Sequence, residues 1–242
     1  MSAVVTQRSH PDVIHRHARY AGALMLLSVV FGALGEAYLP GKIIVAGDAV
    51  ATAANITAHP TLFRMAFATY LVEAFADIIL CVLWYIILKP VDRNLALISA
   101  FVGVVSMITF AIAESSFWAS SIILKDTGGM TAFTEDQRIA LSYLSLRIST
   151  MIATLFFCFY GTASAIRGFL IMRSGYLPKV LGILLMIGGG GFILRSLTYI
   201  LAPSYGSSLM LMPMAVAGIP LTFWLLVRGA DRAALAERQW RA

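Results

Sequence analysis

The chain has 242 residues, of which 60% are hydrophobic and only 12% are charged, and its mean hydropathy is +0.84. Soluble domains carry a charge on about a quarter of their residues, so the composition excludes that class and favours one compact membrane domain. The formal net charge of +6 comes mostly from the ends of the predicted helices, so it indicates membrane orientation and not a nucleic-acid partner.

Six apolar segments are each long enough to cross a hydrocarbon core, which takes about 20 residues. In chain order these segments are 19–38, 62–88, 95–123, about 134–172, 180–201 and 208–227. Thr134 and Gln137 have the spacing of a capping box, which predicts that the fourth helix starts there. We expect a loose tail over 1–18, the membrane domain over 19–228, and a basic amphipathic helix over 229–242 that lies on the membrane surface.

The stretch between the first two segments predicts a short helix that caps the bundle. Asp48 is a good N-cap, and the alanine-rich run that follows has a high helix propensity. We expect Val50 and Ala54 to face the bundle, with Thr52 or Asn55 near its charges. The cap residues that we assign to the site are Asp48, Asn55, His59 and Arg64.

The distribution of Lys and Arg predicts the orientation. Twelve lie on the side of the termini, namely Arg8, Arg16, Arg19, Lys89, Arg93, Arg167, Arg173, Lys179, Arg228, Arg232, Arg238 and Arg241. Four lie on the other side, namely Lys42, Arg64, Lys125 and Arg138. The sequence therefore predicts an all-α polytopic membrane protein of the bacterial inner membrane, a six-transmembrane-helix bundle with an extracellular helical cap and both termini cytoplasmic.

Charged residues inside the apolar segments indicate a site. Glu73 and Asp77 lie one helical turn apart among apolar residues, where ionised groups need partners, and we propose Arg147 and Arg195 for that role. A rise of 1.5 Å per residue places most of these charges in one layer of the membrane. The candidate ligand- or proton-binding residues are Glu36, Glu73, Asp77, Glu114, Arg147 and Arg195.

Three motifs carry a resemblance to a known family. They are GDAVATAANITAHPTLFR at 47–64, LKPVDRNLALISA at 88–100 and YLPKVLGILLMIGG at 176–189. With them the chain resembles the domain of unknown function 4386 family of bacterial membrane proteins, over roughly residues 19–227. The resemblance implies a multi-helix integral membrane protein, and it implies no substrate, cofactor or catalytic residue.

Three functions fit this pattern. The first is a protein of the lipid bilayer with an outward-facing charged pocket that binds or transports a small polar molecule, an ion or a lipid headgroup. The second is a non-enzymatic assembly or regulatory protein whose buried Glu–Arg pairs only fix helix packing. The third is an intramembrane enzyme that uses a carboxylate as general base. We assign no catalytic residue, metal ligand or cofactor, because no nucleophile–base or metal-binding motif is present. The two cysteines, Cys81 and Cys158, are expected to be buried free thiols.

Overall fold

The computed structural model describes residues 10–240 and consists of helices and their connections throughout that range. Six of these helices are long and apolar enough to cross a membrane, which confirms the predicted polytopic all-α fold. The elements are α1 (His10–Gly32), η1 (Ala33–Tyr38), α2 (Pro40–Ile43), α3 (Ala49–Ala58), α4 (Pro60–Leu88), α5 (Arg93–Ile123), η2 (Gly128–Ala132), α6 (Glu135–Ser174), α7 (Lys179–Leu201), η3 (Pro203–Tyr205), η4 (Ser208–Leu211), α8 (Met212–Val227) and α9 (Arg232–Trp240).

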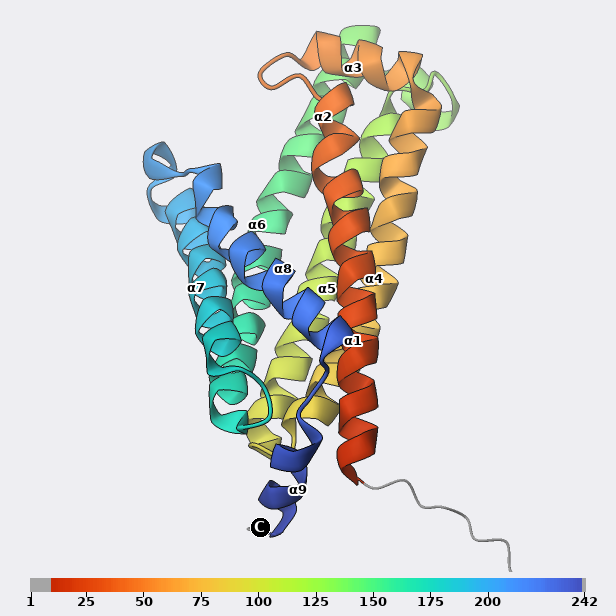
Figure 1. Cartoon of the computed structure of the whole chain (residues 1–242). Helices are drawn as coiled ribbons and strands as arrows, with labels where there is room; N and C mark the ends of the chain where they lie inside the picture. Colours follow the sequence, from red (N-terminus) through yellow and green to blue (C-terminus); the bar gives the residue numbers. More distant parts are fainter. Residues whose placement is uncertain (1–9, 241–242) are drawn as a thin grey trace, which may run out of the picture.

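The six spanning helices form a ring. Each packs against the next one in the chain, and α8 packs back against α1 (Figure 1). Helices α2 and α3 lie at one end of the bundle, which we call the cap end. The start of α1 and helix α9 lie at the opposite end, which we call the terminal end. A Cβ on Gly22 would collide with the backbone of Leu226, so α1 and α8 close the ring tightly towards the terminal end.

Glycine also sets the contact between α6 and α7. A Cβ on Gly168 would lie 2.5 Å from the carbonyl oxygen of Gly182, and Gly161 and Gly189 face each other in the same way. Small residues let membrane helices approach until their backbones touch. The glycine-rich run at 188–191 therefore serves helix packing, as its position inside an apolar helix indicates.

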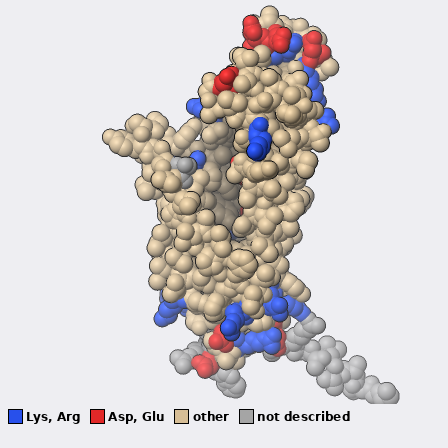
Figure 2. All heavy atoms as spheres, turned by 45° about the horizontal axis from the view of Figure 1, so that its top comes forward, with Lys and Arg blue, Asp and Glu red and all other residues tan. Residues whose placement is uncertain are grey.

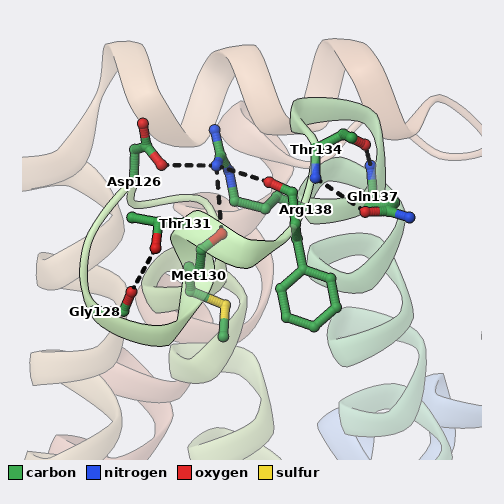
Figure 3. A network of polar contacts seen from close by, with 8 residues as sticks. Asp126, Gly128, Met130, Thr131, Thr134, Gln137 and Arg138 are labelled. Atoms are coloured by element: carbon green, nitrogen blue, oxygen red, sulfur yellow. Dashed lines mark hydrogen bonds and ion pairs between the residues drawn. The ribbon is translucent and has the colours of Figure 1, made fainter.

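Local sequence signals start the helices where they were expected. The side chain of Asp48 accepts a hydrogen bond from Ala51 N at 2.8 Å and caps α3. The hydroxyl of Thr134 accepts from Gln137 N at 3.3 Å, and Gln137 Oε1 accepts from Thr134 N at 2.9 Å, which completes the predicted capping box (Figure 3). Such reciprocal bonds satisfy two backbone donors that a helix start leaves free.

The terminal end is more ordered than the sequence indicated. Helix α1 begins at His10, where a loose tail was expected, and Ile14 and Ala18 are buried. The ring of His15 bonds to the carbonyl oxygen of Ala230 at 2.8 Å, and Leu235 of α9 is buried. The C-terminal helix thus packs on the bundle as well as forming the predicted short helix. Residues 1–9 of the expected tail lie outside the described residues.

The interior has two apolar cores with a polar layer between them. Leu80, Ile87, Leu170 and Leu221 belong to the core towards the terminal end. Phe63, Phe117 and Leu146 belong to the core towards the cap end. Helix α4 passes through both, and its segment between them carries Tyr70, Glu73 and Asp77. The fold therefore places these ionisable residues at mid-bundle depth.

Candidate functional site

The first spanning helix changes its winding where it carries Glu36. The α-helix gives way to a π-helix over Ala33–Tyr38, and the side chain of Glu36 is exposed. Gly32 and Gly35 lie on the side of this region that packs on α4. A Cβ on Gly32 would lie 2.6 Å from Glu73 Oε1, and one on Gly35 would lie 2.5 Å from Thr69 Oγ1. The Glu73 carboxylate thus lies directly against the backbone of α1, and a larger residue at position 32 would force that carboxylate to move.

Glu36, Glu73 and Glu114 form a group that we call the acidic cluster. The three carboxylates come from η1, α4 and α5 and are close enough to interact electrostatically. All three also interact with the Tyr70 hydroxyl on α4. Because α1 and α5 are not neighbours in the ring, the electrostatic interaction between Glu36 and Glu114 runs across the ring and not between adjacent helices. With Asp77, which also interacts electrostatically with Glu73, the structure brings together four of the six predicted site residues.

The acidic cluster lacks compensating positive charge. Among residues 10–240, no lysine or arginine nitrogen lies within 4.0 Å of its carboxylate oxygens. Glu73 Oε2 is buried without a hydrogen-bond partner, and Glu114 is 8% exposed with no hydrogen bond to the rest of the described chain. Buried carboxylates normally have a partner, because an unpaired ionised group is strongly disfavoured away from water. The arrangement therefore requires a proton or a cation from outside the chain.

Asp77 lies one helical turn from Glu73 and also interacts with it electrostatically, but it has neighbours that the acidic cluster lacks. It is 6% exposed and lies near the Ser28 hydroxyl of α1 and the guanidinium of Arg167 on α6. Arg167 is 4% exposed and donates from Nε to Ser99 Oγ at 3.2 Å and from Nη2 to Cys81 Sγ at 3.5 Å. We call these five residues the polar core cluster. It links α1, α4, α5 and α6, and within it the carboxylate and the guanidinium offset each other.

Arg167 corrects the sequence analysis. It was counted among the surface charges at the terminal end, but it lies inside the bundle against Gly103, whose Cβ would lie 2.5 Å from Nη2. Its position seven residues before the end of α6, on the same face as Tyr160 and Ser164, was the signal that could have revealed this. Without Arg167, the sequence count is eleven basic residues against four, and the orientation stays a prediction.

The two predicted arginine partners lie elsewhere. The guanidinium carbon of Arg195 on α7 is 4.5 Å from the centre of the Phe157 ring, and its Nη1 is buried without a hydrogen-bond partner. Arg147 is exposed on α6. In the part of the chain that the structure describes, neither arginine forms an ion pair with Glu73 or Asp77. The expected pairs are therefore not formed, and the cation near Asp77 is Arg167 instead.

A chain of aromatic rings connects the acidic cluster to Arg195. Tyr70 packs edge-on against Phe110 with 4.9 Å between ring centres, and Phe110 stacks on Phe156 at 4.5 Å. Phe156 then contacts Phe157 at 5.1 Å, and Phe157 carries Arg195. These rings come from α4, α5 and α6 and were not recognised from the sequence. They connect Tyr70, which interacts with the acidic cluster, to the ring that contacts Arg195.

The bundle is hollowed at the cap end. Elements η3 and η4 pack on α7 and α8, whereas η1 and α2 pack on α4 and the cap. The two groups splay apart, and Figure 2 shows a hollow between them on this face. Glu36 is exposed in η1, one of the elements that border this hollow.

The cap residues hold the cap together and do not contact the acidic cluster. Asn55 Nδ2 donates to Ile43 O at 3.0 Å, while His59 and Arg64 are exposed. The expected orientation of α3 is wrong, because Val50 is 66% exposed and Ala54 is also exposed. The Thr52 hydroxyl donates to Asp48 O at 2.7 Å and accepts from Val45 N at 3.0 Å, so this face turns inward instead. The buried residues of α3 are Thr52, Ala53 and Ile56.

The fold and the polar layer define a multi-pass α-helical membrane protein with an acidic cluster inside its ring of helices. Residues 20–229 match the family described as Domain of unknown function (DUF4386), and the chain belongs to this family, as the three sequence motifs indicated. The chain is similar to an uncharacterized protein of Archaeoglobus fulgidus, to which it is 25% identical over 153 residues, 63% of this chain and 76% of the relative. No solved structure matches it.

Proposed function

We propose that this membrane protein binds a small organic cation at the acidic cluster, in the hollow that opens at the cap end. The observation that carries the proposal is the set of three carboxylates from three elements with no cation of the chain beside them. On the predicted orientation, the hollow faces the outside of the cell. The sequence suggested a small polar molecule, an ion or a lipid headgroup as the ligand, and a small organic cation is the ligand that we choose among these.

The charge balance inside a membrane supports a cationic ligand. Carboxylates at this depth pair with an opposite charge or take up a proton. Because Arg147 and Arg195 do not pair with Glu73, the balancing charge comes from a ligand or from protons. A cation that enters therefore displaces protons, and protons return when it leaves. Cation binding should strengthen as the pH rises, because protons compete for the same carboxylates.

The aromatic residues favour an organic cation over a metal ion. Tyr70 and Phe110 lie beside the acidic cluster, and aromatic faces attract ammonium groups when water is excluded. Within residues 10–240, no three His, Cys, Asp or Glu side chains converge as a metal site requires. The three carboxylates do not form a metal-binding group. A primary or quaternary ammonium ion is several ångströms wide and would fill the space between them.

A purely structural role fits the polar core cluster better than the acidic cluster. Asp77 and Arg167 offset each other and join four helices, as expected for charges that fix packing. The same region is closed towards the terminal end, where Gly22 contacts Leu226. Movement of a ligand across the membrane would require this contact to open, so we propose binding from the cap end as the first step of any transport.

Thermal unfolding of the purified protein tests the proposal. Tetramethylammonium, choline, butylammonium and spermidine are compared with sodium at matched ionic strength, and with acetate as the anionic counterpart. At a hundred times its dissociation constant a ligand stabilises by about 2.7 kcal/mol, which for a chain of this size raises the midpoint by about 5–11 °C. We expect such a shift with at least one ammonium ion, and a larger one at higher pH.

The variants decide where that ion binds. Glu73→Gln with Glu114→Gln should abolish the shift, since it removes two of the three carboxylates. Glu135→Gln is the matched control, because Glu135 is an exposed carboxylate at the cap end and lies outside the acidic cluster. Stabilisation by acetate alone, or equal loss of the ammonium shift in the control, contradicts the proposal.

A further inference from the structure

A second site lies at the cap end, apart from the acidic cluster. A pocket of about 470 Å³ is formed where the end of α3, the start of α4 and the end of α5 meet. Its apolar part comes from Phe63, Trp118 and Leu124, and its polar part includes Arg64 and Lys125. None of the acidic-cluster residues lines it. The pocket thus combines an apolar floor with two basic side chains.

The two basic side chains are free of ion pairs. Arg64 and Lys125 are exposed, and neither forms a salt bridge within the described part of the chain. Asp126 is the acidic residue of the lining, but Arg138 Nη1 binds its carboxylate at 2.8 Å (Figure 3). The same nitrogen also donates to the carbonyl oxygen of Phe133, which fixes Arg138 on that side. The lining therefore keeps a net positive charge that no salt bridge offsets among residues 10–240.

The depth of the pocket matches the polar surface of a membrane. Arg64 is the fifth residue of α4, and Trp118 lies five residues before the end of α5, so both are within about 8 Å of the helix ends. Tryptophan is enriched at this level of a bilayer, where one part of the ring contacts acyl chains and the other contacts headgroups. Phosphate groups of lipids occupy the same level.

A neighbouring pocket at the cap end lacks such uncompensated positive charge. It has a volume of about 440 Å³, lies on the other side of α3 and shares Thr57 and Leu124 with the first pocket. Its charged residues are Glu135 and Arg138, and the latter is already bound to Asp126. Only the first of these two pockets therefore offers uncompensated cations.

We propose that the pocket of Arg64 and Lys125 binds a phosphate group, either that of an anionic lipid or a free phosphate. Arginine presents two parallel N–H donors to phosphoryl oxygens, and lysine adds a mobile point charge. The glycerol and the first methylenes of a lipid would lie on Phe63, Trp118 and Leu124. This site recognises an anion at the membrane surface, and it is independent of the cation site inside the ring.

Lipid titration tests this site. The full chain is purified in a neutral detergent, stripped of lipid and titrated with phosphatidylglycerol, and bound lipid is counted by native mass spectrometry. Each basic residue near a membrane surface contributes about a fivefold change in binding. We expect Arg64→Gln with Lys125→Gln to weaken the tightest binding event about 25-fold, and Lys42→Gln to leave it unchanged. Lys42 is the matched control, because it is exposed at the cap end beside Tyr38 and outside the pocket.

Two further arms complete the test. Inorganic phosphate without lipid distinguishes a free phosphate from a lipid headgroup as the ligand. If phosphate stabilises the protein and the effect needs Arg64 and Lys125, the ligand is free phosphate. If phosphate has no effect but phosphatidylglycerol binds, the ligand is the lipid. The swap Arg64→Lys with Lys125→Arg keeps both charges and should restore binding, which separates loss of the site from loss of the fold. The proposal is overturned if the double Gln variant binds phosphatidylglycerol like the wild type, if Lys42→Gln loses as much binding, or if neither probe binds the wild type.

Discussion

The polar core cluster gives the sharpest prediction about stability. Replacing Arg167 with Gln leaves the Asp77 carboxylate buried at 6% exposure without the positive charge that lies near it. Replacing Asp77 with Asn leaves the guanidinium buried at 4% exposure with neutral partners. Each single change therefore creates one uncompensated charge inside the bundle, whereas the double change creates none.

The magnitude follows from what orphaned buried charges do in other proteins. Breaking a buried ion pair by removing one partner destabilises by about 3–5 kcal/mol. For a chain of this length, each kcal/mol changes the unfolding midpoint by about 2–4 °C, so each single variant should melt roughly 6–20 °C early. The double variant should recover most of that loss, because both charges are then absent and neither is left uncompensated.

The assay is thermal unfolding of the purified variants in one detergent, with Glu73→Gln as the contrast. Glu73 has no cationic partner, so its neutral substitute should leave the midpoint unchanged or raise it. A double variant as unstable as the sum of its singles would refute the pairing of Asp77 with Arg167. If the Glu73→Gln variant melts as early as the Arg167→Gln and Asp77→Asn variants, an arginine does compensate the acidic cluster.

Three further predictions concern a close contact, a helix start and the orientation. Gly32→Ala should lower the midpoint and reduce any shift by an ammonium ion, because its Cβ would lie 2.6 Å from Glu73 Oε1; unchanged binding would remove Glu73 from the ligand site. Thr134→Ala should lower the stability by about 1 kcal/mol, or 2–4 °C, through loss of the capping box, as read by the same melting assay. In intact cells, an impermeant thiol reagent should label Lys42→Cys and not Arg173→Cys, and the opposite pattern would reverse the predicted orientation.

The fold could be predicted from the sequence because its signals are local. A run of about 20 apolar residues needs no tertiary context to be recognised, and the caps at Asp48 and Thr134 act within four residues. The π-helix that carries Glu36 is different. It depends on how α1 packs on α4 through Gly32 and Gly35, and neither glycine indicates by itself which neighbour it meets.

The pairing of charges could not be predicted, because it depends on how the helices rotate against one another. Counting residues from the helix ends placed Glu73 and Arg195 at similar depths, but depth does not fix direction around the helix axis. Arg195 turns to the ring of Phe157, and Arg167, which was assigned to the surface, turns inward to Ser99 and Cys81. The sequence analysis therefore grouped six charged residues by depth, and the arginine partners that it proposed for Glu73 and Asp77 do not form ion pairs with them in the described part of the chain.

The orientation of the cap helix shows the same limit on a smaller scale. Apolarity alone favoured Val50 as an inward residue, whereas hydrogen bonds of the Thr52 hydroxyl turn the opposite face inward. A hydroxyl that satisfies backbone groups of the preceding loop decides the rotation of so short a helix. Such a bond between residues seven positions apart is not apparent from composition.

Carbodiimide labelling tests the central claim, that the acidic cluster is compensated from outside the chain, most directly. A hydrophobic carbodiimide reacts with protonated carboxyl groups inside membranes, and mass spectrometry identifies each labelled residue. The account predicts that Glu73 and Glu114 are labelled, that labelling falls as the pH rises, and that a stabilising ammonium ion protects both. Asp77, which lies near the Arg167 guanidinium, should be labelled more slowly under the same conditions. Labelling of Asp77 at the same rate as Glu73, or labelling of Glu73 that no ammonium ion reduces, would contradict the account.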